Sequence, residues 1–299
     1  MLWGVGRGMM GGMGGLFEET GMPATLTPLR YPGGKSALYP KVKAIIEANG
    51  LTGCTYVEPF AGGAGLALKL LMRGDVGRIV INDVDPCIYA FWKCAVEQPD
   101  RLCAMIESTP ITVEEWKRQK AIHDEKRHDD IHAIAFATLF LNRANVGGII
   151  KGGIIGGLGQ TGKYKIDARF NKPGLIQKIQ KISSFKKAIT VENMDAAHLL
   201  SSDYLKAYSN VFLNIDPPYV EQGSHLYTNA FDEGQHESLS EVIKALSHLW
   251  ILTYDKCALV ERLYSEFRRE SVSLRYSISK NIESSEFLFY CHQLKQCEV

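Results

Sequence analysis

The segment Asp216-Pro217-Pro218-Tyr219 has the residue types best suited to chemistry on an amino group. Prolines fix φ and lack an N–H donor, so this backbone is rigid and its carbonyls stay free to accept hydrogen bonds. The Asp216 carboxylate and a proline carbonyl, taken as that of Pro217, can together hold both hydrogens of one amino group. Tyr219 offers a flat apolar face for stacking a base. A Pro-Pro turn that merely ends a strand is the alternative, but the flanking aspartate and tyrosine favour a functional segment.

A glycine-rich turn and a later acid form a second candidate site. The turn runs from Glu58 to Gly65 and contains Phe60 and Gly62. Such a turn after a strand lets backbone amides and a helix N-terminus approach a cofactor closely. Asp83 follows about 20 residues later, the spacing at which an acid accepts hydrogen bonds from ribose hydroxyls. The turn departs from the Gly-x-Gly-x-x-Gly fingerprint, and a purely structural turn and cap are the alternative, but the spacing favours a nucleotide-binding site.

The hydrophobic pattern predicts the elements that position these segments. Strands 55–57 and 78–81, with an apolar helix between them, have the βαβ rhythm of an α/β sheet. That rhythm returns later in the chain, with strands at 188–191, 211–215 and 250–253, helices at 235–246 and 256–267, and two C-terminal strands. Helical patterns also occupy 37–48, 90–141 and 172–182. We therefore expect one α/β sheet domain with a helical insertion from about Glu97 to Lys187.

This insertion is basic although the 299-residue chain has a formal net charge of only +1. From Arg143 to Lys187 there are ten cations and one anion, Asp167, a local charge of +9. Eight glycines between 146 and 162 are too many for a regular helix or strand, so a loop is predicted there. A basic segment of this kind is typical of a surface that faces a polyanion, and a solvated lysine face is the alternative.

Composition argues against several other classes. The seven cysteines are odd in number and no pair has Cys-x-x-Cys spacing, so we expect no zinc site, no disulfide framework and a reducing compartment. No run of about 20 apolar residues occurs, so we expect no membrane span. Residues 1–25 begin with a stretch rich in Met and Gly and are expected to form a disordered leader rather than a signal peptide.

In these motifs and their order, the chain resembles the Dam-type, or D12 class, DNA adenine methyltransferases. The resemblance runs from about Leu29 to Tyr290, with the cofactor motif first, the basic insertion second and Asp-Pro-Pro-Tyr third, which is the α-group order. Further segments that resemble the family are Arg-Tyr-Pro-Gly-Gly-Lys at 30–35, Ile-Asn-Asp-Val-Asp at 81–85, Leu-Asn-Arg at 141–143, Thr-Asn-Ala-Phe at 228–231, Ser-Ile-Ser at 277–279 and Glu-Phe-Leu at 286–288.

The resemblance implies a Rossmann-like, S-adenosylmethionine-dependent methyltransferase sheet with a helical, basic target-recognition insertion. Residues 26–96 and 188–299 would form the catalytic domain and residues 97–187 the target-recognition domain. The implied cofactor is S-adenosyl-L-methionine, and the implied partner is double-stranded DNA, from which an adenine is flipped and methylated at N6. Residues implied in cofactor binding are Tyr31, Lys35, Glu58, Phe60, Gly62, Asp83 and Asp216. Asp216, Pro217 and Tyr219 would hold the adenine, and Asn142, Arg143, Lys151, Ser277 and Ser279 would contact DNA.

The recognition segment departs from the Dam branch. That branch has an aromatic residue and an asparagine after Leu-Asn-Arg, where this chain has Val146 and Gly147. Lys151 stands in place of an arginine that reads guanine, and lysine lacks the bidentate fork of arginine. We therefore expect a recognition sequence other than GATC.

The implied chemistry is direct methyl transfer to an amino nitrogen, with no metal and no covalent enzyme nucleophile. Methylation of cytosine N4 uses the same chemistry, although its motif more often begins with serine. A protein glutamine methyltransferase typically has asparagine there and needs no basic insertion. A catalytically inactive DNA-binding or cofactor-sensing module is the remaining alternative. We expect a monomer in the cytoplasm, associated with the nucleoid, and leave a cognate restriction enzyme open.

Overall fold

The computed structural model describes residues 25–31, 34–125, 129–201, 203–220, 231–276 and 282–295. Its centre is a seven-stranded sheet in the order β3-β2-β1-β4-β5-β7-β6. Neighbours among β1 to β5 pair in parallel, and β7 lies antiparallel between β5 and β6. The strands are β1 (Thr55–Glu58), β2 (Arg78–Asn82), β3 (Ile189–Glu192), β4 (Val211–Ile215), β5 (Leu249–Asp255), β6 (Arg268–Tyr276) and β7 (Ile282–Tyr290).

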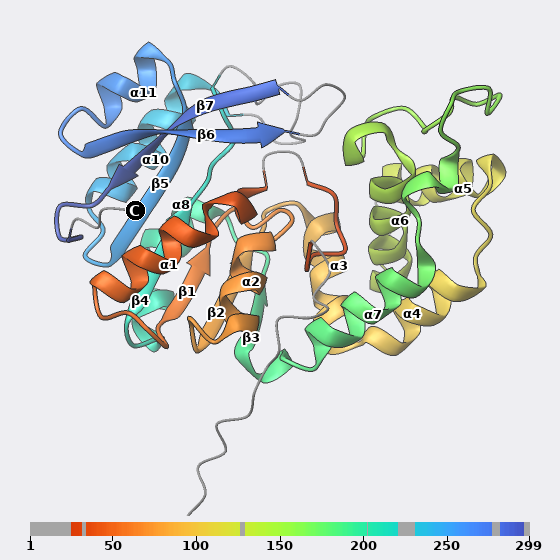
Figure 1. The fold of residues 1–299 in the computed structure, drawn as a ribbon, viewed down its shortest axis with the longest axis horizontal. Coiled ribbons are helices and arrows are strands. Elements are labelled where there is room, and N and C mark those ends of the chain that lie inside the picture. Colours follow the sequence, from red (N-terminus) through yellow and green to blue (C-terminus); the bar gives the residue numbers. More distant parts are fainter. Residues whose placement is uncertain are drawn as a thin grey trace, which may run out of the picture.

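Helices cover both faces of this sheet, which explains its apolar strands. α1 (Tyr39–Ala48) and α2 (Gly65–Arg73) lie on one face, and α8 (Ala196–Ser201) and α10 (Glu233–Lys244) on the other (Figure 1). α11 (Ala258–Leu263) follows β5. Every residue of β1 and of β4 is buried, as in parallel strands covered on both sides. The predicted α/β sheet of the Rossmann-like type is therefore confirmed.

The long helical pattern divides into separate helices at capping residues. They are α3 (Pro86–Glu97), α4 (Pro99–Ser108), α5 (Val113–Asp124), α6 (Ile131–Ala144) and, further on, α7 (Lys172–Ser183). Asp85, Thr112, Asp130 and Asn171 each accept a backbone N–H at the start of a helix, which satisfies groups that the helix leaves unpaired. We call α4 to α7 and their connections, residues 99–183, the helical subdomain.

The helical subdomain lies to one side of the sheet, and α3 lies between the two (Figure 1). α3 packs against β3 as well as against α6 and α7, so it belongs to both parts. Between α6 and α7 the predicted loop is confirmed. It contains only two short 3-10 helices, η2 (Val146–Gly148) and η3 (Ile166–Arg169), and one isolated bridge between Asn145 and Ile154.

Several short elements were not predicted. They are the 3-10 helices η1 (Lys35–Leu38), η4 (Lys186–Ala188) and η5 (Asp203–Ala207), and helix α8. Within the described ranges, six cysteines are free, and no cluster of three potential metal ligands occurs. None of the helices in those ranges is both long and apolar enough to cross a membrane.

Candidate active site

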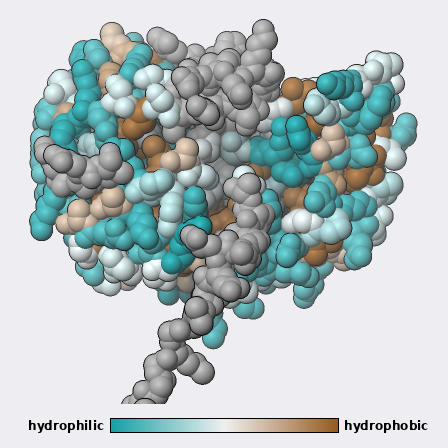
Figure 2. Space-filling view, in the orientation of Figure 1, coloured by the Kyte–Doolittle hydropathy of each residue, from teal (hydrophilic) through white to brown (hydrophobic). Residues whose placement is uncertain are grey.

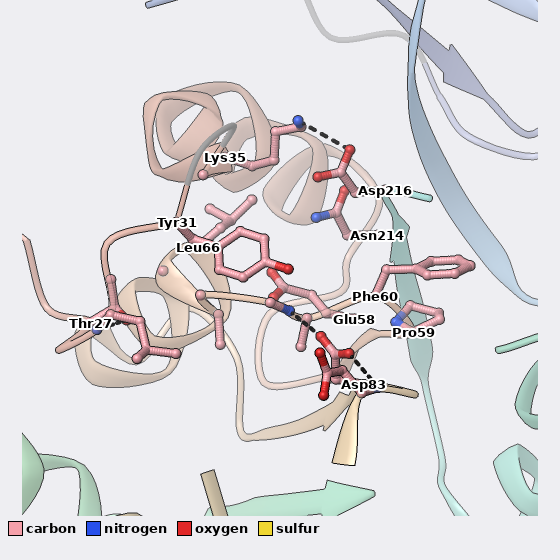
Figure 3. A pocket seen from close by; sticks show the side chains of 18 of the residues that line it. Thr27, Tyr31, Lys35, Glu58, Pro59, Phe60, Leu66, Asp83, Asn214 and Asp216 are labelled. Atoms are coloured by element: carbon pink, nitrogen blue, oxygen red, sulfur yellow. Dashed lines mark hydrogen bonds and ion pairs between the residues drawn. The ribbon is translucent and has the colours of Figure 1, made fainter. Parts of the chain in front are cut away.

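The carboxyl ends of three neighbouring parallel strands meet at one pocket. Glu58 ends β1, Asp83 follows β2 and Asp216 follows β4. β1 lies between β2 and β4, where the strand order reverses, and this switch point is where open α/β sheets bind their ligands. All three carboxylates line a pocket of about 440 Å³ (Figure 3). That volume is in the usual range for a small-molecule site.

The glycine turn gives space to an aromatic ring. Gly62 has φ +45°, and a Cβ there would lie 2.6 Å from Cε1 of Tyr31. A Cβ on Gly63 would lie 2.7 Å from Cβ of Tyr31, so both glycines are required for the ring to lie over the turn. The indole of Trp92 donates to the Gly62 carbonyl at 2.8 Å and so holds the turn. The glycines therefore position Tyr31 at the pocket wall.

Asp83 is held by two backbone amides. Gly62 N donates to its Oδ2 at 2.9 Å, and Asp85 N donates to its Oδ1 at 3.0 Å (Figure 3). Burial raises the pKa of Asp83 to about 7, against the opposing effect of these two hydrogen bonds. Each carboxylate oxygen keeps a second lone pair for a ligand. Asp83 can thus accept hydrogen bonds from hydroxyl groups in the pocket.

Asp216 is oriented through only one of its oxygens. Its Oδ1 accepts a hydrogen bond from Thr253 Oγ1 at 2.7 Å and lies 3.1 Å from Lys35 Nζ and 3.3 Å from Tyr219 Oη. Within the described part of the chain, Oδ2 forms no hydrogen bond or ion pair. Since Asp216 lines the pocket, its second oxygen is available to a ligand there.

Lys35 is the centre of a buried polar network. Its Nζ donates to Tyr219 Oη at 2.7 Å and lies 3.4 Å from Glu286 Oε2. The Tyr219 hydroxyl in turn donates to Glu286 Oε2 at 2.6 Å. Glu286, on β7, is fully buried, and burial raises its pKa against the opposing charge of Lys35. The Lys35 ammonium group therefore links Asp216, the residue after β4, to Glu286 in the C-terminal hairpin.

Glu58 and Asn214 form the floor beside this network. Burial, reinforced by the charge of Asp216, raises the pKa of Glu58 to about 8, so this carboxyl is largely neutral at pH 7. Its Oε1 accepts hydrogen bonds from Ala67 N at 3.2 Å and Tyr56 Oη at 3.3 Å. Asn214 Oδ1 is buried and has no hydrogen-bond partner among the described residues. Both side chains line the pocket and can accept or donate hydrogen bonds to a ligand.

Aromatic and proline side chains complete the wall. The rings of Phe60 and Phe231 meet edge to face with centroids 6.1 Å apart, and both line the pocket together with Pro218. Pro217 is buried and does not line the pocket. Tyr219 is only 3% exposed and also lies outside the lining, with its hydroxyl in the Lys35 network. Pro218 is therefore the proline side chain that this motif presents to the pocket.

Asn142 forms hydrogen bonds inside the protein. It is 1% exposed, its Oδ1 accepts from Arg30 N at 2.7 Å, and its Nδ2 donates to Arg30 O at 2.8 Å and Gly148 O at 2.9 Å. A Cβ on Gly148, where φ is +80°, would lie 2.3 Å from Arg30 O. Asn142 thus joins the chain before Tyr31 to the end of α6, and a DNA contact for it stays a prediction, since its side chain forms hydrogen bonds inside the protein.

The other predicted DNA-contacting residues are in different situations. Arg143 lines the pocket, and its Nε donates to Arg169 O at 2.7 Å. Lys151 is exposed on the glycine-rich loop. Ser277 and Ser279 lie outside the described residues. On the face shown in Figure 2, hydrophilic residues cover most of the helical subdomain, and hydrophobic ones form small scattered patches.

Comparison with known proteins assigns the family. A model of the D12 class N6 adenine-specific DNA methyltransferases matches residues 31–278, which is most of the chain. The chain belongs to this family. This D12 class methyltransferase is also similar to the Type II methyltransferase M.MjaIII of Methanocaldococcus jannaschii, with 21% identity over 207 residues, covering 64% of this chain and 68% of the relative.

Two solved structures have a more distant likeness to this D12 class protein. One is described as an RNA methyltransferase of Pyrococcus horikoshii, with 9% identity, a TM-score of 0.43, and coverage of 88% of this chain and 86% of that chain. The other is the rRNA methyltransferase AviRa of Streptomyces viridochromogenes, with 13% identity, a TM-score of 0.37, and coverage of 87% and 86%. The family match confirms the predicted adenine-specific DNA methyltransferase, and the family implies a methyl donor of the S-adenosylmethionine type.

Three residues of the site were missed from sequence. Thr253 and Asn214 lie inside apolar strands, where one polar residue gives little signal. Glu286 directly precedes the apolar run Phe287–Tyr290, and a carboxylate next to such a run in a buried strand indicates a buried partner. That signal could have identified Glu286, although not its partners.

Proposed function

We propose that this protein transfers a methyl group from S-adenosyl-L-methionine to N6 of an adenine flipped out of duplex DNA, in the pocket beside Asp216. The observation that carries this proposal is the one-sided fixation of Asp216. Thr253, Lys35 and Tyr219 all contact Oδ1, which leaves Oδ2 available to a ligand. A carboxylate held in this way is a preorganised acceptor for one hydrogen of an amino group.

The amino nitrogen of adenine is a weak nucleophile because its lone pair is delocalised into the ring. Acceptors on both hydrogens favour a pyramidal nitrogen with an available lone pair. Asp216 Oδ2 supplies one acceptor, and a backbone carbonyl of the Asp-Pro-Pro segment supplies the other. The assignment of that carbonyl to Pro217 stays a prediction, because Pro217 is buried and does not line the pocket in this structure. Because proline contributes no N–H, this backbone cannot turn a donor toward the base. Orientation is therefore the main contribution of these residues to the rate.

The pocket fits the proposed cofactor by charge and by shape. Five carboxyl groups line it, namely Glu58, Asp83, Asp85, Asp195 and Asp216, of which Glu58 is largely neutral and Asp83 partly protonated at pH 7 because burial raises the pKa of both. When bound, the cofactor supplies a methyl group carried on a cationic sulfonium, and acidic surroundings favour such a cation. Asp83 accepts hydrogen bonds from its ribose hydroxyls. Tyr31 and Phe60 provide aromatic faces, and Gly62 provides the close approach of the turn.

The DNA side of the proposal rests on the helical subdomain and its basic loop. We propose residues 97–187 as the target-recognition domain, with Arg143 and Lys151 facing the DNA and Ser277 and Ser279 approaching it from the C-terminal hairpin. Stacking of the flipped base on Tyr219 stays a prediction, because its ring is 3% exposed in this structure. The protein is proposed to act on double-stranded DNA in the cytoplasm as a monomer.

The test is nucleoside analysis by mass spectrometry. DNA is incubated with purified protein and cofactor, digested and separated beside an Asp216→Ala control. N6-methyladenine that appears with the natural protein and is absent with the control supports the proposal. N4-methylcytosine would refute the base assignment. Unmodified DNA from protein that binds the cofactor would refute DNA methylation itself.

A further inference from the structure

Glu286 places a second carboxylate beside the ammonium group of Lys35. Its side chain is fully buried on β7, and its Oε2 lies 3.4 Å from Lys35 Nζ and accepts a hydrogen bond from Tyr219 Oη at 2.6 Å. The same Nζ lies 3.1 Å from Oδ1 of Asp216, toward which the Lys35 side chain points (Figure 3). One buried lysine therefore lies between two carboxylates from different parts of the sheet, the end of β4 and the C-terminal hairpin.

A second lysine of this protein shows how an ammonium group pairs with a single carboxylate. Lys41 has one carboxylate partner among the described residues, Glu270 on β6, and its Nζ lies 2.9 Å from both Oε1 and Oε2. Lys35, with two carboxylate partners, contacts one oxygen of each. An ammonium group is a compact charge with three donors, so it approaches both oxygens of a carboxylate when no other anion attracts it. The second carboxylate, Glu286, therefore accounts for the one-sided contact between Lys35 and Asp216.

This one-sided contact determines which oxygen of Asp216 a ligand can use. Oδ1 accepts a hydrogen bond from Thr253 Oγ1 at 2.7 Å and pairs with Lys35, whereas Oδ2 forms no hydrogen bond or ion pair within the described ranges. An ammonium group on both oxygens would occupy the position that an amino group takes at Oδ2. It would also make the carboxylate a weaker acceptor, because its charge would be neutralised from both sides. The position of Lys35 therefore controls the acceptor that the proposed reaction needs.

The charge of Glu286 depends on the same contacts. Burial, reinforced by the charge of Asp216, raises the pKa of Glu286, and the charge of Lys35 is the main influence that opposes this rise. Both described groups at Oε2, the Lys35 ammonium and the Tyr219 hydroxyl, are donors, and donors stabilise a carboxylate. Oε1 has no hydrogen-bond partner among the described residues. The carboxylate therefore acts on the site through one oxygen, with Lys35 as its counterion.

We propose that Glu286 is a positioning residue for methyl transfer, whose carboxylate keeps the Lys35 ammonium on Oδ1 of Asp216 and so leaves Oδ2 to the amino group of the base. Glu286 does not line the pocket, so it acts through Lys35 and not by touching the base or the cofactor. This inference rests on the proposed function and goes beyond it, because it gives the C-terminal hairpin a role in the reaction.

The test uses Glu286→Gln, which keeps the shape of the side chain and an oxygen that can accept from Tyr219 but removes the charge. Lys35 should then approach both oxygens of Asp216. Single-turnover methylation with saturating cofactor and DNA should be roughly 10- to 100-fold slower, because the acceptor for the amino group is lost. Glu286→Asp keeps the charge on a shorter side chain and should react faster than Glu286→Gln. Glu286→Met, of similar length, replaces the Gln variant if that variant does not fold.

Glu270→Gln is the matched control, because it removes a carboxylate of the same hairpin that also pairs with a lysine, Lys41, and accepts from a tyrosine, Tyr290. Glu270 does not line the pocket, so this control should leave the single-turnover rate unchanged. Thermal melting confirms that each variant is folded. Crystal structures of the natural protein and of Glu286→Gln then give the distances from Lys35 Nζ to the two oxygens of Asp216. We expect hydrogen-bond distances to both oxygens only in the variant.

The rates and the structures decide the question together. A slow Glu286→Gln variant with Lys35 on both oxygens of Asp216, and partial recovery in Glu286→Asp, support the inference. Equal rates for Glu286→Gln and Glu270→Gln overturn it, as does a Glu286→Asp variant as slow as Glu286→Gln. A variant structure in which Lys35 stays away from Oδ2 also overturns it. If the natural protein methylates no DNA, the proposed function is refuted, whereas the crystal structures still show whether Glu286 keeps Lys35 away from Oδ2.

Discussion

Thr253→Val isolates the contribution of one hydrogen bond to the orientation of Asp216. Thr253 is fully buried on β5, and its hydroxyl donates to Asp216 Oδ1 at 2.7 Å. Valine has nearly the same shape and keeps the packing, so the substitution removes the donor and little else. We expect the turnover number to fall while the affinity for the cofactor stays nearly constant.

The magnitude follows from the contacts that remain. A hydrogen bond to a charged group contributes about 1.5–3 kcal/mol. Lys35 Nζ at 3.1 Å and Tyr219 Oη at 3.3 Å still contact Oδ1 in the variant, so the carboxylate keeps part of its orientation. We therefore expect an effect near the lower end of this range, an increase of about 1.5–2 kcal/mol in the activation barrier, which is roughly a 13- to 30-fold decrease in kcat.

The assay is single-turnover methylation with saturating cofactor and DNA. Thr253→Ser restores the hydroxyl and should restore most of the rate. Thr138→Val is the matched control, because Thr138 is equally buried but its hydroxyl bonds to the Ile134 carbonyl within α6 at 2.8 Å. If Thr253→Val and Thr138→Val have equal rates, or if Thr253→Ser is as slow as Thr253→Val, the orientation of Asp216 by Thr253 is refuted.

Three further results are expected. Because burial raises the pKa of Asp83 to about 7 and ribose hydroxyls need the ionised carboxylate, cofactor affinity should rise with pH through this value. Calorimetry should show that the cofactor binds roughly tenfold more weakly one pH unit below this pKa than well above it. The Asp83→Asn variant should bind the cofactor more weakly than the natural protein, and its affinity should not depend on pH in this range. Gly62→Ala would place a Cβ 2.6 Å from the Tyr31 ring and should weaken cofactor binding more than tenfold. Gly74→Ala, at φ +78° with open space around it, should only lower stability by about 1 kcal/mol. Asn142→Ala should lower the free energy of unfolding by about 3 kcal/mol because it leaves buried partners unpaired, whereas a residue that only contacts DNA would leave the melting temperature unchanged.

The sequence predicted the site residues whose position follows from the strand that directly precedes them. Asp83 and Asp216 each follow a short apolar strand, and parallel strands bring their carboxyl ends to one edge of the sheet. Their meeting at a pocket therefore follows from the βαβ rhythm alone. The glycine-rich loop between α6 and α7 was also predictable, because glycine in such numbers disfavours both helix and strand.

The network around Lys35 was not predictable from spacing. Glu286 lies 67 residues after Tyr219, on a strand that inserts antiparallel between β5 and β6. No local pattern indicates that β7 lies between β5 and β6, and this position of β7 brings Glu286 to Lys35. The internal hydrogen bonds of Asn142 were not predictable for a similar reason, because a polar residue near a helix end has the same sequence signal whether it faces DNA or bonds to Arg30, 112 residues away.

We expect the pocket at Asp216 to methylate adenine N6 in DNA at a defined sequence. Single-molecule modification sequencing of DNA from cells that express the protein, beside cells that express Asp216→Ala, tests it most directly. We predict N6-methyladenine at one short motif, other than GATC, in the first sample and none in the second. Equal modification in both samples, or no modified adenine in cells with abundant folded protein, would contradict the claim.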